Sequence, residues 1–353
     1  MNERLWGRMV VLGGLVLSGL VGAAGLPHGA GVAEVEAAFP GSNGLIAYIT
    51  NGNVPPFESD IYTISPNGKK ITRLTENAGA NVDPAWSADG ARIAFESNRD
   101  GNADVYVMNA DGSGQTNLTN DPGCDSWPAW SPDGAKIAFV RCPDISINEI
   151  WVMNADGTGQ TQLTNNGVNS LFPAWSPDGT KIAYSVNTNG NASDLWVMNP
   201  DGSGQTNLTS GIETGADPEW SPDGTKLSFV TGRDGNGEIY VMNADGSGQT
   251  NLTNNSADEY DHAWSPDGKQ LVFTSTRSGY ARLYSMNADG SKQKELKTGK
   301  LLGGYVDHPD WQPLPDNRAR DKAVKGKGSG HEHGHKDHKH GGRKHNGEGR
   351  NRR

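Results

Sequence analysis

One position, repeated six times along the chain, carries side chains that could bind a ligand. It lies three residues before a recurring tryptophan, and the residue found there changes from copy to copy. The six residues are Asp83, Trp127, Phe172, Asp217, Asp261 and His308, with Asp307 beside the last. Carboxylates grouped with aromatic rings can bind a cation such as calcium, or a basic or amidic group of a peptide. A second interpretation stays open, in which the aspartates only begin turns ahead of proline in a solvated ring.

Histidines gather in a second place, the segment 318–353. Those whose imidazoles could bind zinc or nickel there are His331, His333, His335, His338, His340 and His345. Their spacing is irregular, which predicts weak, adventitious metal binding. The segment also holds 12 Lys and Arg against 4 Asp and Glu, a net charge of +8. It is therefore expected to be a disordered basic tail, and it could contact an anionic surface.

The two cysteines of the chain are placed for a disulfide. Cys124 and Cys142 are almost equally far from the centre of a predicted hairpin turn between Ser131 and Lys136. They should therefore face each other across an antiparallel strand pair, within disulfide reach. Such a bond fits an exported protein, with buried free thiols as the alternative. A Cys-x-x-Cys motif does not occur, so redox catalysis is not expected.

The elements that would position these residues repeat about every 45 residues. The repeat is marked by a tryptophan that usually precedes Ser-Pro-Asp-Gly, and these tryptophans are Trp86, Trp130, Trp175, Trp220, Trp264 and Trp311. A short apolar run follows each complete copy, then a segment such as Val105–Asn109, then a polar strand. Pro, Asp and Gly supply the turns between them. Each copy is thus expected to be a four-stranded antiparallel sheet.

The number of copies predicts an all-β, six-bladed β-propeller over residues 43–313. The first copy, starting at Gly44, lacks its inner strand, and an extra inner strand appears at residues 309–313. Ring closure by pairing these two segments leaves no exposed sheet edge. In such a ring the position three residues before each tryptophan lies near the mouth of the central channel, so the residues that vary there are predicted to line that mouth. Because every blade has the tryptophan, we interpret it as a structural wedge between neighbouring sheets. An acidic residue that recurs before the third strand, such as Asp104, is also interpreted as structural.

The N-terminal segment reads as a secretion signal over residues 1–24. Arg4 and Arg8 precede an apolar run from Met9 to Leu20, and small residues follow; cleavage as late as residue 38 is also compatible with the sequence. An uncleaved anchor helix is the alternative; after cleavage no membrane span is expected. The predicted location is periplasmic or secreted. Outside the tail the net charge is −18, which disfavours nucleic acid as a partner.

The repeated blocks resemble the propeller repeats of the TolB family. Trp-Ser-Pro-Asp-Gly, Ile-Ala-Phe, Ile-Tyr-Val-Met-Asn and Leu-Thr carry the resemblance from Gly44 to Pro313. It implies a periplasmic or secreted propeller whose channel face docks another envelope or extracellular protein. TolB itself has an additional N-terminal α/β domain, and little lies between the signal segment and the first repeat here.

Three classes of function follow from the sequence. The favoured one is a monomeric, non-catalytic binding scaffold. A hydrolase would need a large α/β domain with a Gly-x-Ser-x-Gly turn, which the sequence lacks. A lyase would need a metal or polar cluster in the channel, where His262 and His308 are the available histidines. The third class is a cell-surface or matrix protein whose tail binds metal or an anionic polymer.

Overall fold

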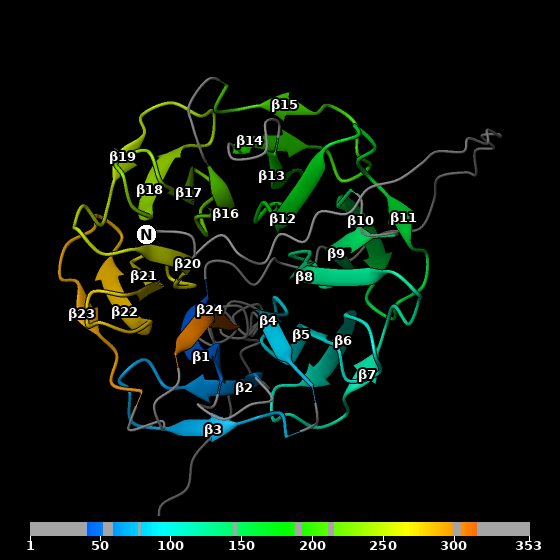
Figure 1. Ribbon diagram of the computed structural model, residues 1–353, viewed down its shortest axis with the longest axis horizontal. Coiled ribbons are helices and arrows are strands. Elements are labelled where there is room, and N and C mark those ends of the chain that lie inside the picture. Colours follow the sequence, from blue (N-terminus) through cyan, green and yellow to red (C-terminus); the bar gives the residue numbers. More distant parts are fainter. Residues whose placement is uncertain are drawn as a thin grey trace, which may run out of the picture. The chain divides into compact units, whose positions relative to one another are not determined.

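The computed structural model describes residues 41–51, 59–76, 79–143, 147–187, 193–210, 215–298 and 305–315. Within these ranges all regular elements are strands, and they form six four-stranded antiparallel sheets. Figure 1 shows the sheets arranged radially, with one strand of each nearest the centre. The predicted six-bladed, all-β propeller is confirmed.

Within each blade the strands are given in order from the centre of the ring outward. Blade 1 comprises β24 (Val306–Leu314), β1 (Ser42–Asn51), β2 (Ser59–Ile64) and β3 (Ile71–Arg73). Blade 2 comprises β4 (Asn81–Trp86), β5 (Arg92–Ser97), β6 (Asp104–Asn109) and β7 (Thr116–Asn117). Blade 3 comprises β8 (Cys124–Trp130), β9 (Lys136–Cys142), β10 (Glu149–Asn154) and β11 (Thr161–Gln162).

The other three blades repeat this order. Blade 4 comprises β12 (Asn169–Trp175), β13 (Ile182–Asn187), β14 (Ser193–Met198) and β15 (Thr206–Asn207). Blade 5 comprises β16 (Ala216–Trp220), β17 (Lys226–Thr231), β18 (Glu238–Asn243) and β19 (Thr250–Asn251). Blade 6 comprises β20 (Glu259–Trp264), β21 (Gln270–Ser275), β22 (Arg282–Asn287) and β23 (Lys294–Glu295).

The ring closes through blade 1. Strand β24 pairs with β1, with Trp311 opposite Ile46. The Gln312 side chain accepts a hydrogen bond from the Leu45 amide at 3.0 Å and donates to the Gly90 carbonyl of blade 2 at 2.7 Å. A Cβ on Gly44 would lie 2.8 Å from the Gln312 carbonyl oxygen, so the closure requires glycine there. The last strand therefore completes the first blade, as the repeat count predicted.

The apolar core lies between the blades. The described residues form six buried clusters, and each combines side chains from two neighbouring sheets. Trp86, for example, packs with Ile49 and Ile61 of blade 1 and is 5% exposed. The other repeated tryptophans also lie in or against these interfaces. Burial of an indole here contributes about 3 kcal/mol to stability.

The recurring acid attaches the short outer strand to the third strand of its blade. In blade 2, Thr119 Oγ1 donates to Asp104 Oδ1 at 3.1 Å and accepts from the Val105 amide at 3.0 Å. The equivalent acid–threonine pairs are Asp60–Thr75, Glu149–Thr164, Asp194–Thr209 and Glu238–Thr253. The threonine thus adds a side-chain link to the backbone pairing that holds this short strand in these blades.

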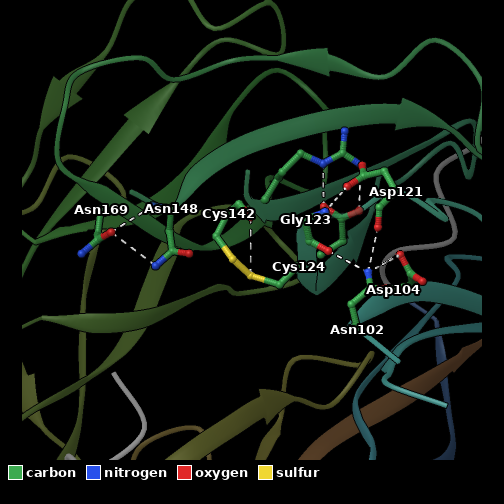
Figure 2. The surroundings of a disulfide bond; sticks show 10 residues. Asn102, Asp104, Asp121, Gly123, Cys124, Cys142, Asn148 and Asn169 are labelled. Carbon is green, nitrogen blue, oxygen red and sulfur yellow. Dashed lines mark hydrogen bonds and ion pairs between the residues drawn. A yellow bond between two sulfur atoms is a disulfide. The ribbon is translucent and has the colours of Figure 1, made fainter. Parts of the chain in front are cut away.

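Blade 3 contains the predicted disulfide. Cys124 and Cys142 are paired residues of β8 and β9, with Cα atoms 5.2 Å apart, and their sulfurs are bonded. Figure 2 shows the bond between two polar networks. Arg141, the neighbour of Cys142 in the sequence, pairs with Asp125 at 2.7 Å and with Asp121. The sequence-predicted pairing is therefore confirmed.

Candidate binding site in the channel

The six residues predicted to line the channel share one backbone conformation. Each has a positive φ, between 38° and 54°, at a β-bulge in the innermost strand of its blade. A bulge redirects the side chain of the extra residue. All six line one cavity of about 220 Å³ at the centre of the ring. Asp307 is not part of that lining and contacts His308 instead.

The left-handed conformation explains part of the residue choice. Asp, Asn and His tolerate a positive φ better than other non-glycine residues, which suits Asp83, Asp217, Asp261 and His308. The side chains of Trp127 and Phe172 do not favour a positive φ, and this conformation destabilises the folded protein by roughly 1–2 kcal/mol at each of the two residues. Their presence at strained positions points to a use for aromatic rings in the channel.

His308 lies among three carboxylates. Its Nε2 is 3.0 Å from Asp83 Oδ1 and 3.7 Å from Asp261 Oδ2, and its Nδ1 is 3.8 Å from Asp307 Oδ2. Burial by itself lowers the pKa of His308, but these three carboxylates raise it well above its usual value. The imidazole is therefore positively charged and acts as an internal counter-ion.

More carboxyl groups line the same side of the channel. Burial, followed by the charge of Asp261, raises the pKa of Asp217 to about 7. Burial also raises the pKa of Asp310 to about 6, and that of Glu219 well above its usual value. Glu219 and Asp310 were not among the residues predicted from the sequence. They stand one residue before the tryptophan, where the other four copies have alanine, so the same comparison of repeats could have found them.

His262 is a further departure from the repeat and was not among the predicted binding residues. It replaces the proline found at this position in the other five copies. Its Nε2 lies 2.7 Å from Ser228 Oγ, which also accepts from Trp264 Nε1 at 2.8 Å. Burial lowers the pKa of His262 to about 4, so the ring is neutral. Its buried Nδ1 has no hydrogen-bond partner among the described residues and lies 3.7 Å from Asp217 Oδ2.

The order Asp217, His262, Ser228 has the composition of a hydrolytic triad, but its geometry does not suit catalysis. Ser228 is fully buried on strand β17, and its hydroxyl already contacts two side chains. A substrate carbonyl cannot reach this oxygen, and a nucleophile must be accessible. The equivalent positions carry Ala or Val, so Ser228 is best understood as the partner that a buried histidine requires.

The opposite side of the channel is aromatic. The rings of Trp127 in blade 3 and Phe172 in blade 4 have centroids 4.7 Å apart and planes inclined by 54°. Blades 5, 6, 1 and 2, which follow one another around the ring, carry the acids and histidines. The cavity is therefore divided into an acidic side and an aromatic side (Figure 1 locates the inner strands β4, β8, β12, β16, β20 and β24 that bear these residues).

The acidic side can hold positive charge, although its donor set does not match calcium. Ligand atoms of Asp261, Asp307 and His308 lie within 4.8 Å of one another. Calcium takes six to eight oxygen ligands, whereas this group includes an imidazole nitrogen. With His308 charged, the group already contains its cation. An organic cation that makes hydrogen bonds to the carboxylates suits this arrangement better.

Comparison with known proteins agrees with the fold and the repeats. The family profile described as "TolB beta propeller domain" matches residues 33–142, 113–216 and 149–319. The chain belongs to the TolB β-propeller family. No curated protein matches this TolB-type sequence.

Solved structures share the TolB-type fold. TolB from Acinetobacter baumannii matches with a TM-score of 0.67 and 22% identity over 76% of this chain and 67% of that one. A putative TolB from Agrobacterium tumefaciens matches with a TM-score of 0.59 and 22% identity over 72% of this chain and 89% of that one. Hydrazine synthase from Kuenenia stuttgartiensis matches with a TM-score of 0.66 and 16% identity over 78% of this chain and 47% of that one. At these identities the likeness concerns the fold alone.

Several predictions concern parts of the TolB-type chain that lie outside the described residues. These are the signal segment 1–24, the tail 318–353 and the tail histidines with their predicted zinc or nickel binding. In the part of the chain that the structure describes, no helix has the length and apolar character needed to cross a membrane.

Proposed function

We propose that this TolB-type propeller is a non-catalytic binding module that docks a segment of another envelope or extracellular protein into its channel. The observation that carries the proposal is the lining of the cavity. On a scaffold that repeats almost unchanged, the channel residues differ from blade to blade. Variation at equivalent positions is expected where a ligand without sixfold symmetry contacts each blade differently.

The chemistry of the channel also favours binding over catalysis. Ser228 is inaccessible, and His308 is held as a cation by its carboxylate neighbours. A charged imidazole with a raised pKa is a poor general base at neutral pH. The aromatic pair and the carboxylates instead offer apolar contact and charge, which are the usual components of a recognition site.

A location outside the cytoplasm is part of the proposal. The disulfide between Cys124 and Cys142 is of a kind that persists in oxidising compartments. The N-terminal sequence has the pattern of a secretion signal, and the family resemblance implies the periplasm or secretion.

Site-specific photo-cross-linking in intact cells tests this function. A photoreactive phenylalanine analogue replaces Phe172 in the channel and, as the control, Thr161, which is exposed on the outermost strand β11. We expect a discrete protein adduct from position 172 that is absent from position 161. Substitution of the channel residue Asp217 by Asn in the same chain should reduce the yield. Equal adducts from both positions, or none from position 172, would refute channel docking.

A further inference from the structure

The acidic side of the channel has more carboxyl groups than its internal cation contacts. Asp83, Asp217, Asp261, Glu219 and Asp310 line the cavity, and His308 is the positively charged side chain among the lining residues. His308 contacts only Asp83 and Asp261 of this set, at 3.0 and 3.7 Å. Burial raises the pKa of Asp217, Asp261 and Asp310, and neighbouring carboxylates raise it further for Asp217 and Asp261. A cation beside these groups would favour their ionised form. The channel is therefore electrostatically suited to receive a further positive charge.

An unpartnered group points into the same region. Nδ1 of His262 is buried, and this side chain has no exposed area. Buried polar atoms in proteins normally have a hydrogen-bond partner. This atom lies 3.7 Å from Asp217 Oδ2, too far for a direct hydrogen bond. A ligand between or beside these two groups would satisfy them, which marks this part of the channel as a site and distinguishes it from a simple cluster of acids.

The cavity volume limits what can enter. About 220 Å³ is less than the roughly 300–1,000 Å³ of a typical small-molecule pocket. It accommodates one or two side chains and cannot admit a folded domain. Trp127 and Phe172 can pack against an apolar side chain while the carboxylates hold a charged one.

We propose that the channel recognises a polypeptide segment in which a lysine or arginine adjoins an aromatic or aliphatic residue. The ammonium or guanidinium group displaces the His308 ring from Asp83 and Asp261, and the apolar neighbour packs on Trp127 and Phe172. His308 then sets specificity, because it competes with the ligand for Asp83 and Asp261. Only a cation that makes better hydrogen bonds to these carboxylates than His308 does can displace its ring. This inference rests on the proposed binding function and specifies its partner chemistry.

The test uses two dipeptides that differ by one charge. N-acetyl-Phe-Lys-amide is the cationic probe, and the same peptide acetylated on the lysine Nζ is the neutral one. Calorimetric titration of the full chain measures both dissociation constants. We expect the cationic peptide to bind at least about tenfold more tightly, the ratio typical of a charged hydrogen bond. Equal affinities would overturn the proposal.

Variants locate the effect in the channel. Asp261→Asn should remove most of the preference for the cationic peptide, whereas Asp156→Asn should leave it unchanged, because Asp156 is in an exposed turn beyond β10. Asn tolerates a positive φ, so Asp261→Asn keeps the bulge. A preference that survives Asp261→Asn, or that Asp156→Asn abolishes equally, would place the site elsewhere and overturn the inference.

Substitution of His308 tests the displacement directly. His308→Asn removes the competing cation and keeps a residue that tolerates the left-handed conformation. The cationic peptide should then bind several-fold more tightly, while the neutral peptide should not change. A weaker or unaltered affinity for the cationic peptide would show that His308 does not compete.

Trp127→Leu tests the aromatic side of the channel. In the parent protein the cationic peptide should bind more tightly with Phe than with Ala at its first position, and Trp127→Leu should reduce this difference in affinity. An unchanged difference would exclude the aromatic side from the site. Circular dichroism confirms that each variant is folded.

The two proposals can fail separately. If both dipeptides bind equally while the cross-link from position 172 is found, docking stands and the cationic preference is wrong. If the dipeptide preference holds but no protein is cross-linked at position 172, the charge recognition stands and the docking function is wrong.

Discussion

Removing the disulfide of blade 3 tests how strongly one covalent link stabilises a propeller that is otherwise held by strand pairing. Cys124 and Cys142 are 18 residues apart in sequence and are paired in register across β8 and β9. Closing a loop of this length in the unfolded chain corresponds to about 3 kcal/mol at 25 °C in the chain-entropy model. Replacing both cysteines by alanine should therefore lower the free energy of unfolding by about this amount.

Guanidinium chloride unfolding, followed by tryptophan fluorescence with and without a thiol reductant, measures this effect. Reductant should shift the parent protein to the midpoint of the double variant and leave the double variant unchanged, which serves as the control. Two results would refute the reasoning: a double variant as stable as the oxidised parent, or a double variant that still responds to reductant. The first result would mean that residual strand pairing already holds the chain between Cys124 and Cys142 together in the unfolded ensemble, so that the disulfide restricts it no further.

Two further predictions concern pH and ring closure. Asp217 has a folded-state pKa of about 7, raised from 3.8, so the folded protein retains a proton that the unfolded chain loses, and stability falls as pH rises between these values. The free energy of unfolding of Asp217→Asn minus that of the parent should therefore increase by up to about 3 kcal/mol from pH 5 to pH 8, as measured by denaturant unfolding. The same difference at both pH values would contradict a raised pKa for Asp217. Gln312→Ala removes the two hydrogen bonds that the Gln312 side chain makes, one to β1 and one to blade 2, and should cost about 2 kcal/mol in the same assay. An unchanged midpoint would show that β24 is held without the Gln312 side chain, by pairing with β1, by Trp311 and by the hydrogen bond from the Trp86 amide to Asp310.

The fold was predictable because the repeat supplies the same information several times. Local turn chemistry fixes each hairpin, and six equivalent tryptophans mark six blades. The missing first strand and the extra last one then leave ring closure as the economical solution. The disulfide was predictable for the same reason. Once the turn of a hairpin is located, counting outward from it gives the residues that face each other on the two strands.

The candidate site was predictable only in part. Comparing equivalent positions singled out the bulge residues, and all six do line the channel. It did not reveal why aspartate is common there, because the positive φ depends on the bulged pairing with the second strand. Nor did it reveal that Asp307 stands behind His308 and outside the cavity lining, or that Glu219 and Asp310 join the same group.

The sequence by itself determined the blade number, the closing strand and the residues that vary around the channel, since these depend on contacts between near neighbours and on repetition. Only the tertiary structure decided which of these side chains contact one another, such as His308 of blade 1 with Asp83 of blade 2 and Asp261 of blade 6. The same is true of His262, whose partner Ser228 belongs to a different blade. These relations depend on distances across the ring, and distances between strands from different blades are set by packing, which no local pattern encodes.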